Sequence, residues 1–272
     1  MTLLVMAMLG IADAAAAQAA SVSPQALLLT SQSRIGTLHV LNPYSTPIEV
    51  VIDLRYGYVT TDSAGQAIVT LPDDSVAAPN SAVPLLRVTP ARFILVPGAV
   101  QLVRVAAFPP ATLAEGEYWA RIGIRAIPPS NTGGAEGRGI AVGVGIQVKT
   151  VLPVFYRHAR VATGVRMATL APRRLDDSLI VQPTFTRSGS AAALLAVETV
   201  ITDGAGEVLA RSMRQAAVYH TLSPRYALAL TPAQWARATT VRVTATSQRP
   251  DLPAGLPLPV LPVSQSVAIR SP

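Results

Sequence analysis

Apolar and polar residues alternate with a period of two along much of the chain. The alternation runs from Ile48 to Tyr58 and again from Gly116 to Ile127, and it predicts β-strands with one buried face. Turn-forming residues such as Pro97-Gly98 and Asp203-Gly204-Ala205-Gly206 separate the apolar segments. A helical pattern is limited to one turn, from Pro232 to Ala236. The chain is therefore predicted to be all-β and built as β-sandwiches.

The longest aliphatic row lies between Gly139 and Lys149. Its apolar positions are Ile140, Val142, Val144, Ile146 and Val148. Gly, Ala and Gln stand between them, so the opposite face of such a strand is nearly bare. A row of this kind either belongs to the core of its own domain or is offered to another chain, and the pattern alone leaves both alternatives open.

The chain has 272 residues, which is enough for two ordinary domains. We expect a secretory signal peptide at 1–20, a first domain at 21–158 and a second β-sandwich domain at 159–272. The apolar segment from Leu3 to Ala12 and the cleavage pattern Ala17-Gln18-Ala19 indicate the signal, although Arg34 is the first basic residue. The alternative is a buried N-terminal helix. No later apolar run reaches the roughly 18 residues of a transmembrane helix, so no membrane insertion is expected.

Composition and charge narrow the functional classes. The net charge of +7 comes from arginines scattered along the chain, with Arg173-Arg174 as the densest cluster and Lys149 as the only lysine, and this pattern disfavours nucleic-acid binding. The chain has no cysteine, which excludes disulfides and thiolate chemistry. His39, His158 and His220 lack the spacing of metal ligands. With no catalytic cluster either, we expect no enzyme activity, no cofactor and no metal.

Several short motifs stand in the order and spacing found in one protein family. They are Leu38-His39-Val40-Leu41-Asn42, Val88-Thr89-Pro90, Leu95-Val96-Pro97-Gly98, Gln101-Leu102-Val103-Arg104-Val105, Gly116-Glu117-Tyr118 and Pro153-Val154-Phe155-Tyr156-Arg157. Over most of Ser21 to Arg160 the chain resembles the periplasmic pilus-assembly chaperones of the chaperone–usher pathway, as a divergent member. The C-terminal part matches this family more loosely.

The resemblance implies two immunoglobulin-like β-sandwich domains at an angle, with a cleft that binds an incomplete pilus or fimbrial subunit. It implies a periplasmic chaperone that binds, folds and caps this subunit by lending it a strand and then delivers it to an outer-membrane usher. The lent strand in this sequence would carry Val142, Val144, Ile146 and Val148, with Ile140 as a fifth position. Two copies of the chain are also expected to cap each other's strand as a homodimer, because an open edge strand aggregates.

The resemblance also implies two charged sites. Glu117 and Arg157 fall where the family has an interdomain ion pair, and Asp251 is a candidate third member. Many members anchor the subunit's carboxylate with an Arg on the first strand and a Lys four residues before the motif's Arg. Here Pro153 takes the second position, and no Arg lies on the first strand. The candidate substitutes are Lys149, Arg34 and Arg87, because a carboxylate prefers a nearby guanidinium or ammonium group.

A second class of protein fits the same sandwiches. The alternative is an exported structural subunit or adhesin of a surface fibre. Such a subunit lacks a strand of its own and carries a free donor extension at its N-terminus. Here the alternating row lies in the middle of the chain and leads into the motif that ends at Arg157, which favours the chaperone.

Overall fold

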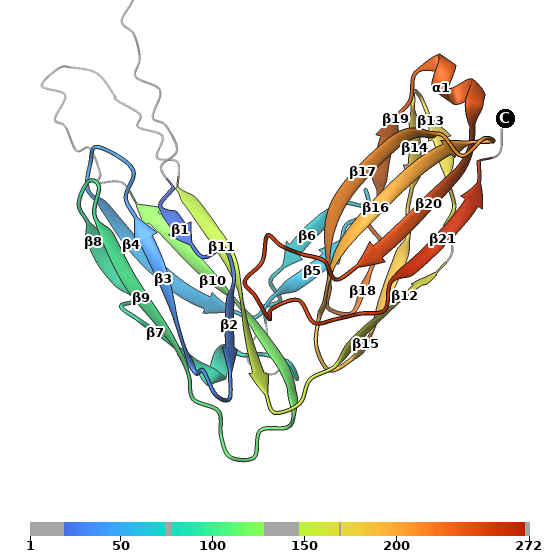
Figure 1. Ribbon diagram of the computed structural model, residues 1–272. Helices are drawn as coiled ribbons and strands as arrows, with labels where there is room; N and C mark the ends of the chain where they lie inside the picture. The colour runs from blue at the N-terminus through green and yellow to red at the C-terminus, as the bar shows by residue number, and fades with distance from the viewer. Residues whose placement is uncertain (1–18, 74–77, 128–146, 169, 270–272) are drawn as a thin grey trace, which may run out of the picture.

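The chain folds into two β-sandwiches that diverge from a common junction, as the ribbon in Figure 1 shows. This computed structural model describes residues 19–73, 78–127, 147–168 and 170–269. Residues 1–18 of the expected signal peptide and four positions of the aliphatic row, Ile140, Val142, Val144 and Ile146, lie outside the described residues. No helix in the described part is long and apolar enough to cross a membrane.

The first sandwich consists of two sheets. One sheet has the order β1 (Ser21–Ser23), β3 (Ile35–Leu41), β9 (Val100–Ala107), β7 (Leu86–Thr89). The other has the order β2 (Leu27–Thr30), β11 (Val148–His158), β10 (Gly116–Ile127), β4 (Ile48–Arg55), β8 (Arg92–Leu95). The pairs in both sheets are antiparallel, except that β2 runs parallel to β11. A short 3₁₀ turn, η1 (Val83–Leu85), precedes β7.

The second sandwich has one four-stranded sheet and two three-stranded sheets. The four-stranded sheet has the order β17 (Val208–Val218), β16 (Ala193–Asp203), β20 (Ala238–Thr246), β21 (Val263–Ala268). One three-stranded sheet has the order β12 (Thr163–Ala168), β15 (Thr184–Gly189), β18 (Thr221–Leu222). The other has the order β13 (Arg173–Leu175), β14 (Ser178–Val181), β19 (Tyr226–Ala229). The predicted helical turn is α1 (Pro232–Arg237), which begins with a capping box at Thr231.

The predicted alternation is what builds the core of the first sandwich. On β10 the side chains of Tyr118, Ala120, Ile122 and Ile124 point inward and join one buried cluster with residues of both sheets. The second sandwich has a core cluster of its own, centred on β16 and β20. The predicted fold class, all-β with two β-sandwiches at an angle, is thus confirmed.

The sequence pattern missed one hairpin. β5 (Tyr58–Thr61) and β6 (Ala67–Thr70) form a two-stranded ribbon that extends from the first sandwich to the second (Figure 1). Asp62 to Gly65 form the turn of this ribbon, and β6 after it was not among the predicted strands. Ala67, Ile68 and Val69 are all exposed, so β6 lacks the alternation that identifies a half-buried strand.

Candidate functional site

One strand of the first sandwich is paired along only part of its length. β11 pairs with β10 from Val148 to His158. On its other edge it pairs with β2, but only from Val154 to Arg157. Among the described residues, the stretch from Val148 to Pro153 therefore has one edge without a partner strand. Unpaired strand edges are the places where another chain can add a strand.

The open stretch leads directly to the aliphatic row of the sequence. Val148 is the first described residue of that row, and it lies opposite Ala126 near the end of β10. By strand parity Val148 belongs to the same series as Leu152 and Val154, whose side chains enter the core. Val148 itself is only partly buried.

The other face of β10 and β11 looks toward the second sandwich. On this cleft face, Trp119 of β10 and Phe155 of β11 lie opposite each other and are fully buried. They belong to a cluster with Leu194 and Tyr219 of the second sandwich, and the Trp119 and Tyr219 ring centroids are 5.1 Å apart. β10 and β11 therefore have a second apolar surface, opposite the core-facing one, and it forms the junction between the two sandwiches. The alternating sequence pattern did not reveal this surface.

Glu117 and Arg157 meet at this junction. Nε of Arg157 donates to Oε2 of Glu117 at 2.8 Å, and both residues are buried. Nη1 and Nη2 of Arg157 donate to the carbonyl oxygens of Gly255 and Leu256, at 2.6 and 2.5 Å. The backbone N–H of Ala192 donates to Oε1 of Glu117 at 2.9 Å. The pair thus holds together strands of the first sandwich and two segments of the second.

Burial raises the pKa of Glu117 above its ordinary value, against the charge of Arg157 and the hydrogen bond from Ala192, which lower it. Asp251 does not reach this pair. Its carboxylate instead accepts hydrogen bonds from Arg249 and Gln215. The remaining donors of Arg157, on Nη1 and Nη2, are satisfied by the Gly255 and Leu256 carbonyls, which belong to the loop before β21.

The cleft face is basic from the junction toward the open end of β11. Arg121, which is 5% exposed, donates from Nη2 to the Tyr219 hydroxyl at 3.0 Å and lies 5.3 Å from the centre of that ring. Its Nε is buried and has no hydrogen-bond partner in the described part, and the same is true of Nε of Arg125. Burial raises the pKa of Tyr219 to about 12, so the hydroxyl stays neutral.

Of the three predicted anchor residues, one lies on the cleft face. Lys149 is directly opposite Arg125 and forms an ion pair with Asp53 of β4 at 2.9 Å. Arg34 is an exposed loop residue whose Nε donates to the Ser31 carbonyl. Arg87 lies on β7, in the opposite sheet of the sandwich.

Arg121 and Arg125 were missed as site residues by the sequence analysis. A signal for them was present, since they alternate with the core residues of β10 and so had to lie on its other face. The sequence did not show that this face is turned toward a second domain.

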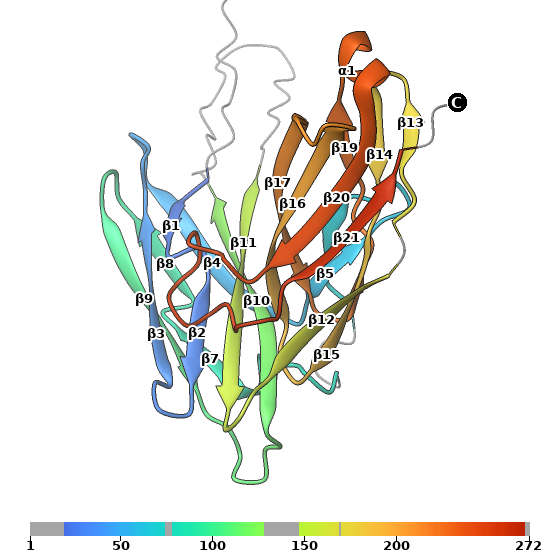
Figure 2. The ribbon, with the colours of Figure 1, turned by 45° about the vertical axis from the view of Figure 1, so that its right-hand side comes forward.

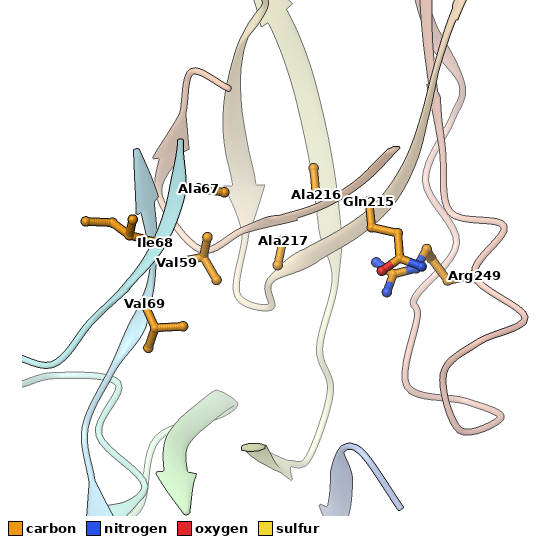
Figure 3. Close-up of a pocket in the computed structure, with 8 residues that line it drawn as sticks. All are labelled: Val59, Ala67, Ile68, Val69, Gln215, Ala216, Ala217 and Arg249. Atoms are coloured by element: carbon orange, nitrogen blue, oxygen red, sulfur yellow. The ribbon is translucent and has the colours of Figure 1, made fainter. Parts of the chain in front are cut away.

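A pocket of about 240 Å³ lies where the β5–β6 hairpin approaches β17. Figure 3 shows hairpin residues on one side and β17 residues, with Arg249, on the other. Its lining residues are Val59, Ala67, Ile68, Val69, Gln215, Ala216, Ala217 and Arg249. The lining is mainly apolar, and Arg249 is paired with Asp251, so the pocket offers no free charged group for chemistry.

The described residues contain no group of three or more His, Asp or Glu side chains that could hold a metal ion. The titratable groups that lie together at the junction, Glu117, Arg157, Arg121 and Tyr219, are held by hydrogen bonds to one another or to the backbone. The arrangement is suited to binding a polypeptide edge and joining two domains.

No family model matches the chain, and no curated protein matches it. Solved structures that are similar to it include the E. coli chaperone DraB, with 15% identity, 84% of this chain and 89% of that chain covered, and a TM-score of 0.44. The structure of the Salmonella enterica SafA pilin in complex with the SafB chaperone matches with 14% identity, 93% and 99% coverage and a TM-score of 0.48. The YadV chaperone matches with 11% identity, 92% and 99% coverage and a TM-score of 0.49. Identities this low leave the function to be argued from this chain's own residues.

Proposed function

We propose that the protein is a chaperone that captures an incomplete pilus or fimbrial subunit by lending it a strand. The observation that carries the proposal is the open edge of β11 from Val148 to Pro153, which continues into the aliphatic row from Ile140 to Val148. A subunit that lacks one strand of its own sandwich has a groove for such a row. Periplasmic residence, delivery to an outer-membrane usher and self-capping as a homodimer are part of the same proposal.

The aliphatic row has enough apolar surface for stable capture. Each Val or Ile that becomes fully buried contributes roughly 1.5–3 kcal/mol. Four or five of them, together with backbone hydrogen bonds along the open edge, outweigh the cost of ordering the two partners. The small residues between them let the subunit's backbone approach the other face of the strand closely.

The cleft face supplies the proposed anchor for the subunit's carboxylate. Lys149 is the predicted anchor that lies on this face, directly opposite Arg125, whereas Arg121 lies opposite Pro153, further along the same two strands. Asp53 partly neutralises Lys149, whereas Arg121 and Arg125 have no carboxylate partner in the described part. A carboxylate placed beside Lys149 and Arg125 would gain charge-assisted hydrogen bonds.

The test replaces apolar row residues with threonine, which keeps the branched shape and strand propensity but adds a hydroxyl group. Val144→Thr and Ile146→Thr are each co-expressed with a fimbrial subunit that forms a complex with the native chain, and the complex is measured by size-exclusion chromatography. We expect the complex to be lost while circular dichroism shows a folded chaperone. The matched control is Val100→Thr, because Val100 is 53% exposed on β9, in the opposite sheet.

Unchanged recovery of the complex with both row variants would refute strand lending. Fractionation separates the two classes of protein. A chaperone stays in the periplasmic extract, whereas a structural subunit or adhesin appears in isolated surface fibres.

A further inference from the structure

We infer that two arms, one from each sandwich, clasp the domains and fix the angle of the cleft between them. The hairpin arm is β5–β6, Tyr58 to Thr70, and it extends from the first sandwich to the second. The strap is the irregular loop from Ser247 to Pro262 between β20 and β21, and it extends from the second sandwich to the first (Figures 1 and 2). The inference goes beyond the proposed function and does not depend on it.

The hairpin arm is fastened to the second sandwich by its backbone and by its side chains. The Arg225 N–H donates to the Gly65 carbonyl at 2.8 Å, and the Ser223 N–H donates to Oγ1 of Thr61 at 2.9 Å. Val59 packs against the core cluster of the second sandwich. The Tyr58 and His220 rings meet edge to face, with centroids 5.1 Å apart.

The strap is fastened to the first sandwich by one fully buried side chain and two carbonyls. Leu256 is 0% exposed and belongs to the cluster that contains Ala26, directly before β2, and Phe155 of β11. The carbonyl oxygens of Gly255 and Leu256 accept hydrogen bonds from the two terminal nitrogens of Arg157. At its beginning the strap is held to its own sandwich, since Arg249 pairs with Asp251 and donates to the Leu195 carbonyl.

Two attachments of this kind restrict the rotation of one sandwich against the other more than a single attachment would. The hairpin arm ends at the loop before β19, whereas the strap ends on β2 and β11, so the two fastening points lie on different sandwiches and on different strands. A rotation of one sandwich against the other would break hydrogen bonds at one point or the other. The cleft is then pre-organised, and a partner need not order the two domains when it binds.

The angle is measured with two spin labels by double electron–electron resonance. The chain has no cysteine, so Arg104→Cys and Arg173→Cys place one label on each sandwich without side reactions. Both residues are exposed and lie outside the arms, on β9 and β13. We expect one narrow distance distribution for the otherwise native chain. A broad distribution in that chain would overturn the inference.

The two sandwiches carry a matched pair of turns for testing the hairpin arm. Gly65 and Gly206 have φ values of 79° and 85°, and each turn is closed by the same hydrogen bonds to an Asp three residues earlier. A Cβ at Gly65 would lie 2.5 Å from Cβ of Arg225, whereas a Cβ at Gly206 meets nothing within 4 Å. Gly65→Ala and Gly206→Ala therefore share the backbone strain, but Gly65→Ala alone also separates the domains.

We expect Gly65→Ala to broaden the distance distribution and Gly206→Ala to leave it narrow. For the strap, Leu256→Ala is compared with Leu261→Ala, a change at an 87% exposed position of the same loop. Leu256→Ala should broaden the distribution, and combining it with Gly65→Ala should broaden it further. Equal distributions for Gly65→Ala and Gly206→Ala would refute the hairpin arm, and equal distributions for the two leucine variants would refute the strap.

Discussion

Replacing Arg157 with methionine removes a guanidinium group and keeps an unbranched side chain at the junction of the two sandwiches. The native guanidinium satisfies one oxygen of Glu117 and the carbonyls of Gly255 and Leu256. Glu117 is 1% exposed, so in the variant its carboxyl group stays buried with only the Ala192 N–H as donor. Removing one partner of a buried ion pair costs about 3–5 kcal/mol, and we expect the free energy of unfolding to fall by that amount at neutral pH.

The loss should depend on pH. Burial already raises the pKa of Glu117 above its ordinary value near 4.5, and Arg157 opposes this rise. Without Arg157 the pKa in the folded state rises further. A raised folded-state pKa contributes stability that is present below the unfolded-state pKa and is lost as the pH rises through the folded-state pKa. The variant should therefore lose more stability relative to the native chain at about pH 8 than at about pH 5.

Urea unfolding followed by tryptophan fluorescence measures this effect. Trp119 is fully buried at the junction, so its emission reports on the contact between the sandwiches. The matched control is Arg92→Met, which breaks an exposed pair with Glu49 and should cost far less than Arg157→Met, because solvent screens exposed pairs. Equal losses for Arg157→Met and Arg92→Met, or a loss that does not change with pH, would refute the reasoning.

Two smaller changes test other parts of the structure. Asn42 is fully buried, donates to the carbonyls of Thr46 and Leu95 and accepts a hydrogen bond from the Tyr44 N–H. Asn42→Ala should therefore lower the free energy of unfolding in urea by about 2–3 kcal/mol. A loss below about 0.5 kcal/mol would contradict this account. In Gly123→Ala the new Cβ would lie 2.1 Å from Cε of Lys149, which displaces that side chain from Asp53. Because an exposed pair is worth less than about 1 kcal/mol, the chain should stay folded while capture of the subunit weakens, and unchanged capture would argue against Lys149 as an anchor.

The all-β class was predictable because its strands alternate, and β10 is the clearest case. Its predicted range, Gly116 to Ile127, is the observed one, and the predicted inward residues are buried. The other face of the same strand was not predictable. Trp119 and Arg121 are buried by the second sandwich, and contacts between residues so far apart in sequence leave no trace in a local pattern.

The candidate site was predictable only in part, for a similar reason. The family motifs placed Glu117 and Arg157 near each other, and the register of β10 and β11 does set them directly opposite. The third member could not be inferred, because the groups that complete the site are backbone carbonyls at Gly255 and Leu256. Carbonyls are present at every residue, so a sequence does not indicate which of them will face an arginine.

The two halves of β11 differ in how the rest of the chain covers them. From Val154 to Arg157 its edge is paired with β2, and on the cleft face of the same stretch Phe155 and Arg157 are covered by the strap. From Val148 to Pro153 the edge has no partner strand among the described residues, although an open aliphatic edge promotes aggregation. In the covered half of β11 both the edge and the cleft face are packed against other parts of the chain, whereas the edge of the other half is left open. The open half is also the half that leads into the aliphatic row, and we therefore expect it to be a pairing surface for another chain.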